Sequence, residues 1–378
     1  MTQLMRKRVV LAKIESSYAT DPTPTGTANA IAVKNLTIMP LAADQVGRDL
    51  IKPYLANFEQ LNANTHCEIE MEVEIAGSGI AGVAPAYGPL LRACAMSETI
   101  TTSSAAITRS SSTATVTSAA HGFANGDTVK ISGASQTEYN GTFVISNVAT
   151  NTFDYTVTGT PATPATGTPL LYKTAQYDPI SASFESVTIY ANNDGVLHKM
   201  TGCRGTVEFN IAARQIPTMK FKFVGLYNAP TDTALPSTDY SSFKTPLVAN
   251  NTNTTPFSFF SYGGVLESLS FNLNNQVEFR ALIGSETVLI TDRKPSGEVL
   301  FEAPALATKD FFAASQAGTL GALTITQGIA NGYKVKIAST QVDIGNPSYE
   351  DNQGIAMLKV PYIPIPSSGN DDFRITVF

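Results

Sequence analysis

Hydrophobic and polar residues alternate along much of this chain, with the period of two that is typical of β-strands. The clearest run is Glu68-Ile69-Glu70-Met71-Glu72-Val73-Glu74-Ile75, in which carboxylates alternate with apolar side chains. Because successive side chains of a strand point to opposite faces, this run predicts a strand with one apolar face and one acidic face. The predicted acidic face consists of Glu68, Glu70, Glu72 and Glu74.

The same patterning predicts further strands on both sides of this run. One lies between residues 30 and 39, and four more are predicted at residues 184–190, 196–200, 206–211 and 219–226. We expect Asn193-Asp194-Gly195 and Gly202-Cys203-Arg204-Gly205 to be turns between these strands, because glycine and asparagine favour tight turns. Pro89, followed by good helix formers as far as Met96, predicts a short helix.

Residues 101–170 differ in composition from the rest of the chain, because few are charged and many are serine or threonine. Runs of β-branched residues, separated by glycine-containing turns, predict strands at residues 113–116, 128–131, 142–148 and 153–157. Short strands at this spacing are typical of a small all-β sandwich. We therefore predict an inserted β module, which ends in a stiff proline-rich segment at residues 161–169.

Composition also divides the remainder of the chain. The segment Asp21-Pro22-Thr23-Pro24 disfavours both helix and central strand, so residues 1–29 are expected to form an extended arm. The predicted first domain comprises residues 30–100 and 171–232. A linker rich in proline, threonine and asparagine, at residues 233–263, leads to a second domain at residues 264–378.

The second domain is similar in pattern to the first. Glu298-Val299-Leu300-Phe301-Glu302-Ala303 aligns with Glu70-Met71-Glu72-Val73-Glu74-Ile75, and two carboxylates coincide. Each segment precedes a short predicted helix, which in the second domain lies near residues 308–315. Further strands are predicted in the same order, at residues 323–326, 333–337 and 356–360. The matching order predicts a duplicated β domain, and the alternative is a chance match between two β-rich stretches.

Composition and charge narrow the classes of function. The chain has 378 residues, of which 43 % are hydrophobic and only 15 % are charged, so extensive buried surface is expected. A net charge of −6 gives no electrostatic reason to bind a phosphate backbone tightly. No run approaches the roughly 18 apolar residues of a membrane span. The three cysteines form neither a CxxC pair nor a disulfide framework, which fits a reducing cytosol.

Candidate catalytic chemistry is sparse. The three histidines lack partners at metal-ligand spacing, since His66 and Cys67 would point to opposite faces of a strand. Two glutamates of the acidic face would lie about 7 Å apart, a separation that glycosidases use. Nothing hydrophobic surrounds them to raise the pKa of one as an acid, however. We therefore predict no enzyme activity, no metal and no cofactor.

Several motifs around the predicted insert resemble those of the major tail tube proteins of long-tailed, siphovirus-like bacteriophages. The resemblance covers about residues 30–100 and 171–230, and its motifs are short. They are residues 90–99 (Leu90-Leu91-Arg92-Ala93-Cys94), 177–181 (Tyr177-Asp178-Pro179), 186–190, 194–198, 202–206 (Gly202-Cys203-Arg204) and 223–227. Within the insert, His121-Gly122-Phe123 and Tyr139-Asn140-Gly141-Thr142-Phe143 resemble an Ig-like module found on phage virion proteins.

The resemblance implies a mainly β fold, a sandwich or barrel with a flanking short helix, assembled into stacked rings that conduct DNA to the host. Six such domains normally form a ring, so a duplicated chain implies a trimer with pseudo-sixfold symmetry rather than a hexamer. The implied partners are other copies of this chain, tail terminator and tail tip proteins, and, within the lumen, the tape measure protein and genomic DNA without sequence-specific binding. The implied location is the virion tail, after synthesis in the host cytoplasm and without membrane contact.

The proline-rich arm and two loops are candidates for contacts between rings. The first loop contains Asp44, Arg48, Asp49 and Lys52, and the second is its counterpart at Asn272–Asn275. Surface loops of this kind are often simply mobile, which is the alternative interpretation. The alternative function is a carbohydrate-binding or adhesive β-sandwich of the virion surface. The absence of tryptophan disfavours it, because such sites use exposed aromatic platforms.

Overall fold

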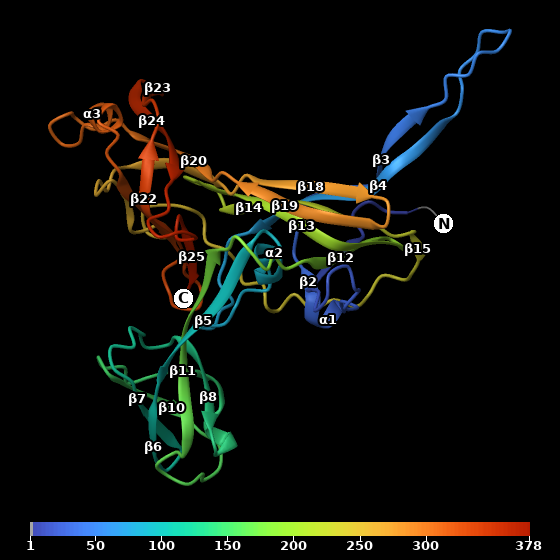
Figure 1. The fold of residues 1–378 in the computed structure, drawn as a ribbon. Coiled ribbons are helices and arrows are strands. Elements are labelled where there is room, and N and C mark those ends of the chain that lie inside the picture. Colours follow the sequence, from blue (N-terminus) through green and yellow to red (C-terminus); the bar gives the residue numbers. More distant parts are fainter. Residues whose placement is uncertain (1–2) are drawn as a thin grey trace.

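The computed structural model describes residues 3–378, and the described chain is built mainly from antiparallel β-strands. Figure 1 shows two sheet regions side by side, with a smaller module projecting from them. The first region contains the elements β1 (Arg8–Ile14), α1 (Gly26–Asn29), β2 (Ala30–Ile31), β3 (Lys34–Gly47), β4 (Gln60–Glu74), α2 (Gly88–Arg92), β12 (Val187–Asn193), β13 (Val196–Ala212), β14 (Thr218–Tyr227) and β15 (Thr231–Asp232).

The first sheet has the strand order β1-β12-β13-β14-β4-β3, and all of these pairs are antiparallel. β4 shows why the sequence folds this way. Its apolar residues Ile69, Met71 and Val73 are buried, whereas the glutamates between them are half-exposed. The buried face packs with α2, whose Leu90 and Leu91 are fully enclosed in the same core. Pro89 lies in the first turn of α2, where its missing N–H costs no hydrogen bond.

Two sequence predictions in this region are wrong. The predicted extended arm contains β1, which pairs with β12 from Arg8↔Asn193 to Ile14↔Val187, because a short apolar run upstream of the prolines is buried at Val10, Leu11 and Ala12. The predicted turn at residues 202–205 is a β-bulge within the continuous strand β13, where the register with β14 shifts between Thr201 and Arg204. Glycine is required at Gly202, whose φ is +62° and whose missing Cβ leaves room for the Tyr18 ring.

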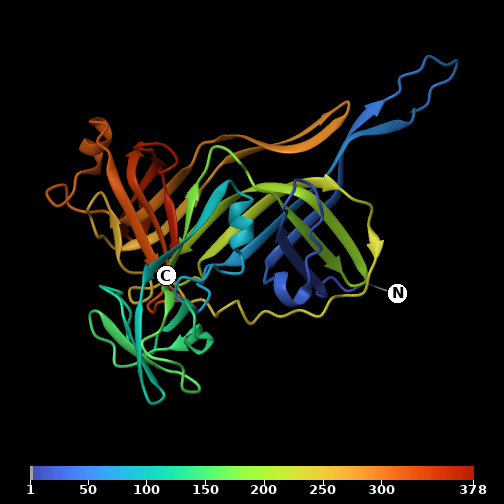
Figure 2. The same ribbon diagram turned by 60° about the horizontal axis from the view of Figure 1, so that its bottom comes forward.

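The inserted module has a hydrophobic core of its own and lies beneath the two sheet regions in Figures 1 and 2. Its connections are the long strands β5 (Met96–Ser104) and β11 (Gly167–Pro179), which pair with each other. The other elements are β6 (Ala106–Ser110), β7 (Thr113–Thr117), β8 (Thr128–Ala134), a 3-10 turn (Thr137–Tyr139), β9 (Gly141–Val144) and β10 (Thr152–Thr156). The Ig-like character of the module stays a prediction.

The second sheet has the strand order β16-β21-β22-β24-β20-β17, again antiparallel throughout. β18 and β19 form a hairpin between β17 and β20. The bounds in this region are β16 (Phe257–Phe259), β17 (Leu266–Asn272), β18 (Asn275–Leu282), β19 (Ser285–Arg293), β20 (Ser296–Glu302), α3 (Phe311–Gln316), β21 (Gly321–Gln327), β22 (Val335–Ile344), β23 (Ser348–Asn352), β24 (Ile355–Pro364) and β25 (Arg374–Val377).

Two further expectations differ from the structure here. The end of the predicted linker at residues 233–263 forms β16, an integral strand that pairs with β21. The predicted contact loop at Asn272–Asn275 is not a free loop, because Leu273 is completely buried and Asn275 is only 7 % exposed. The Asn275 amide donates to the carbonyl oxygens of Cys94 and Gly205, at 2.8 and 2.9 Å. This segment therefore joins the two sheets within one chain.

Candidate assembly interface

The acidic residues of β4 lie on one face of the first sheet, and lysines accompany them. Lys220 lies 3.4 Å from Glu70 and Lys222 lies 3.7 Å from the same carboxylate. Lys34 lies 3.3 Å from Glu74. Glu72 accepts a hydrogen bond from Asn35, and Glu68 lies 3.5 Å from the His66 ring. The neighbouring strands β14 and β3 thus bring cations to the acidic face, which the local sequence of β4 cannot reveal.

One of these ion pairs has an equivalent in the second sheet. Lys359 of β24 lies 3.0 Å from Glu298 of β20. In the alignment of residues 298–303 with residues 70–75, Glu302 is the equivalent of Glu74. Glu302 lies opposite Met357 on β24, and Glu74 lies opposite Thr218 on β14. In this register Lys359 takes the place of Lys220, and Glu298 takes the place of Glu70.

The equivalence extends to the whole sheet. Each half has six strands in the same pairing order, with the same order along the chain and a short helix at the same point. The equivalent pairs are β1 and β16, β3 and β17, β4 and β20, β12 and β21, β13 and β22 with β23, and β14 and β24. The helices α2 and α3 both follow the third strand of their half. A duplicated domain is expected to show this arrangement.

The two sheets are joined edge to edge within the chain. β13 continues beyond β12, and its last five residues pair with β17 from Glu208↔Asn272 to Ala212↔Ser268. At the centre of this joint, the buried rings of Phe209 and Phe271 lie 5.9 Å apart. The joint therefore combines backbone pairing with side-chain packing, because apolar residues of both halves belong to one continuous hydrophobic core.

The hairpin β18–β19 reinforces the joint by lying across the first sheet (Figure 1), on the face that carries Glu68. Phe279 stacks on the His66 ring, with centroids 4.9 Å apart. Arg204 donates to the carbonyl oxygen of Val288 at 2.7 Å and also contacts the Tyr18 ring. Burial lowers the pKa of Arg204 from its ordinary value. These contacts thus fix the position of the second half of the chain relative to the first sheet.

The hairpin formed by β3 and β4 projects away from the body of the molecule (Figure 1). Of the predicted contact residues, Asp44 lies in β3, where it accepts a hydrogen bond from Asn64. Arg48, Asp49 and Lys52 lie in the tip, where Arg48 pairs with Glu59 and Lys52 lies 5.1 Å from the Phe58 ring. Ile51 and Leu55 are fully exposed there.

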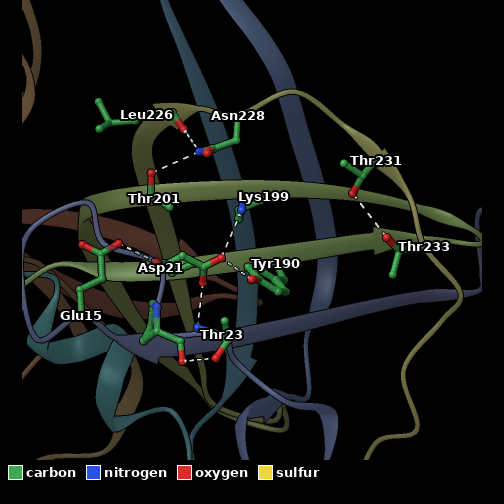
Figure 3. A network of polar contacts seen from close by, with 12 residues as sticks. Glu15, Asp21, Thr23, Tyr190, Lys199, Thr201, Leu226, Asn228, Thr231 and Thr233 are labelled. Carbon is green, nitrogen blue, oxygen red and sulfur yellow. Dashed lines mark hydrogen bonds and ion pairs between the residues drawn. The ribbon is translucent and has the colours of Figure 1, made fainter.

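A polar network that sequence reasoning missed ties residues 15–23 to the first sheet (Figure 3). Glu15 is only 7 % exposed and accepts hydrogen bonds from Ser186, Thr188 and the backbone N–H of Gly202. Asp21 accepts from Tyr190 and Lys199. Burial opposes ionisation of Asp21, but these hydrogen bonds lower its pKa overall. Every carboxylate oxygen here has a structural partner, so the network positions the segment instead of offering a reactive group.

Within residues 3–378, no group of three or more histidine, cysteine or acidic side chains is arranged to hold a metal ion. Over the same residues, no helix has the length and apolar character needed to cross a membrane. The cysteines Cys67, Cys94 and Cys203 are buried and unpaired, and burial raises the pKa of the Cys67 thiol to about 11.

Comparison with known proteins decides the family. The family model described as phage tail tube protein matches residues 5–366, which is nearly the whole chain. The chain belongs to the phage tail tube family. No curated protein matches it. The fold class predicted from the sequence, a mainly β tail tube fold, is confirmed. This tail tube protein is a structural component of the virion tail, where it assembles into stacked rings, and an adhesive role is not supported.

Proposed function

We propose that three chains form one ring of the tail tube, each supplying two similar domains, so that the ring has pseudo-sixfold symmetry. The repeated strand order and the repeated ion pair at Lys220 and Lys359 support this proposal. A hexamer of such chains would place twelve similar sheets in one ring.

The ring conducts genomic DNA through its lumen, which also holds the tape measure protein during assembly. The face that carries Glu70, Glu72 and Glu298 is the proposed lining, because lysines only partly offset its carboxylates. A weakly negative lining repels the phosphate backbone without fixing it, which suits passage without sequence-specific binding. The tail terminator and tail tip proteins cap the two ends of the tube.

Contacts between stacked rings are assigned to the end of the β3–β4 hairpin, namely Asp44 in β3 and Arg48, Asp49 and Lys52 in the tip. The exposure of Ile51 and Leu55 supports this assignment, because an isolated chain gains nothing by presenting them to water. The inserted module occupies the outside of the tube, since it projects from the sheets as a separate unit with its own core.

The protein needs no catalysis, metal or cofactor for this role, and its three free cysteines suit synthesis in the reducing cytoplasm of the host. The mass of the assembled ring tests the proposal. Native mass spectrometry of released rings should give three times the 40.1-kDa chain mass. Six chains in each ring would contradict the trimer, and a chain that stays monomeric at every concentration would contradict ring formation.

A further inference from the structure

The strands β3 and β23, near opposite ends of the described chain, each have one unpaired edge. Among residues 3–378, β3 pairs only with β4, and β23 pairs only with β24. Figure 1 shows these two strands at the two extremes of the molecule. Unpaired edges are templates for pairing with another chain, and proteins rarely leave them uncovered.

These two free edges are the counterparts of the edges that are already joined within the chain. Glu208 of β13 pairs with Lys220, and Ser348 of β23 pairs with the equivalent Lys359, so β23 corresponds to the end of β13. The other edge of the joint is compared in the same way. Asn272 of β17 pairs with Ser296 of β20, and Met39 of β3 pairs with Glu68 of β4, which is the equivalent of Ser296. β3 therefore corresponds to β17, the strand with which β13 pairs.

We infer that β23 of one chain pairs antiparallel with β3 of the next chain, in the register of the internal joint between β13 and β17. This inference rests on the proposed ring and names the strands that close it. The internal register Glu208↔Asn272 becomes Ser348↔Met39 between chains. The pairs Tyr349↔Ile38 and Glu350↔Thr37 follow, and Asn352 comes opposite Lys34.

The side chains on the two edges fit this pairing. Tyr349 is 61 % exposed, and Ile38, which would lie opposite it, is only partly buried at the margin of the core, although both lie in regular strands. In the internal joint, Phe209 is the equivalent of Tyr349 and Phe271 is the equivalent of Ile38. Phe209 and Phe271 form a buried aromatic pair. Docking would therefore cover apolar surface on both partners at the position where the internal joint has its core.

Charge also favours a second copy as the partner. Asp351 would lie opposite the bulged part of β3 around Leu36. The carbonyl oxygen of Leu36 accepts a hydrogen bond from Arg8 at 2.8 Å, so the positively charged Arg8 guanidinium lies beside β3 at this position. The β23 edge carries Glu350 and Asp351, whereas the β3 edge carries Arg8 and Lys34. Opposite charges brought together across strands stabilise the pairing modestly and disfavour other registers.

The inferred joint suits a closed ring. The two edges differ from each other, so the contact is heterologous, and such contacts form a closed ring when the rotation fits. Because the external joint copies the internal one, both carry the same rotation between neighbouring sheets. Three internal and three external joints then complete one turn.

Cysteine pairs test the register directly. Directly opposed residues of neighbouring strands have Cβ atoms about 4.5–5.5 Å apart, close enough for a disulfide after small adjustments. The test variant is Thr37→Cys with Glu350→Cys, and the shifted control is Thr37→Cys with Asn352→Cys. Native cysteines do not interfere, because all three are buried. Assembled tubes are oxidised and examined on a denaturing gel without reductant, and the same samples are imaged by electron microscopy.

The in-register variant should give linked species of two and three chains and none larger, with at least tenfold more linkage than the shifted control. Tubes that form normally but link no better than the control would overturn this joint and leave the tube role intact. Linkage that continues to six chains would support the joint but contradict the trimer. If neither the variants nor the unsubstituted protein assemble, both the proposed ring and the joint fail.

Discussion

Phe209 packs against Phe271 across the joint between the two sheets, although the two residues lie in different halves of the chain. Both rings are fully buried, so the halves share a core at this point. The joint is the internal template for the contact that we infer between chains, and its stability can be measured in the monomer.

Replacing Phe271 by alanine should destabilise the protein by about 3–5 kcal/mol, because it removes a buried ring and leaves a cavity. Urea unfolding followed by circular dichroism measures the change. The matched control is Tyr227→Ala, which removes an aromatic ring that is 39 % exposed and should cost less than about 1 kcal/mol. Equal losses for the two variants would contradict a shared core at the joint.

The Glu15 carboxylate accepts hydrogen bonds that an amide can satisfy only in part. Glu15→Gln places N–H groups against the donors Thr188 and Gly202, so we expect a loss of about 1–3 kcal/mol. Urea unfolding provides the measurement, and Glu138→Gln in the 3-10 turn of the inserted module is the surface control. An unchanged free energy of unfolding for Glu15→Gln would show that the network does not hold residues 15–23 to the sheet.

Asp21 should make the free energy of unfolding depend on pH in the acidic range. Its hydrogen bonds from Tyr190 and Lys199 lower its pKa in the folded state relative to the unfolded chain. A carboxyl group of this kind stabilises the fold above its unfolded pKa, near 4, and loses that contribution as the pH falls through the folded pKa. Asp21→Asn should therefore lower stability at pH 7 and flatten the loss between pH 5 and pH 3, as measured by urea unfolding across that range.

The hairpin tip should control stacking without affecting the fold. Ile51→Asp with Leu55→Asp places charges on two fully exposed residues, so the free energy of unfolding should change by less than about 0.5 kcal/mol. Electron microscopy should then show single rings in place of tubes. Ile283→Asp, at the equally exposed tip of β18–β19, is the control that should leave tubes intact. Normal tubes from the double variant would contradict the assignment of this tip.

The charge of the proposed lining should affect the passage of DNA. Glu72→Lys with Glu302→Lys would make the lining basic, so phage that carry it should eject DNA more slowly. The delay should shrink as salt rises, because the screening length falls from about 10 Å at 0.1 M to about 3 Å at 1 M. Glu138→Lys in the inserted module is the control. Unchanged ejection kinetics in low salt would place this face away from the lumen.

Much of the fold could be predicted from local patterns, and the failures have physical causes. The alternation of residues 68–75 marks a half-buried strand because each glutamate remains solvated. A glycine such as Gly202 is compatible with either a turn or a β-bulge, because both can require a positive φ. Asn275 is typical of a loop, and its burial depends on carbonyl groups of distant residues.

The assembly surface was harder to predict because it depends on register. Glu70 and Glu298 could be aligned by sequence, but their partners Lys220 and Lys359 emerge only when the strands are paired. The free edges of β3 and β23 likewise follow from which strands lack a neighbour. No local pattern encodes that property, because it belongs to the sheet as a whole.

The central claim is that identical copies of this chain join their sheets into a hollow ring. Cryo-electron microscopy of the assembled protein tests it most directly. We predict rings around an open channel, in which six similar β domains come from three chains and β23 of each chain lies beside β3 of the next. A solitary closed monomer at every concentration, in buffer that preserves the virion, would contradict the account.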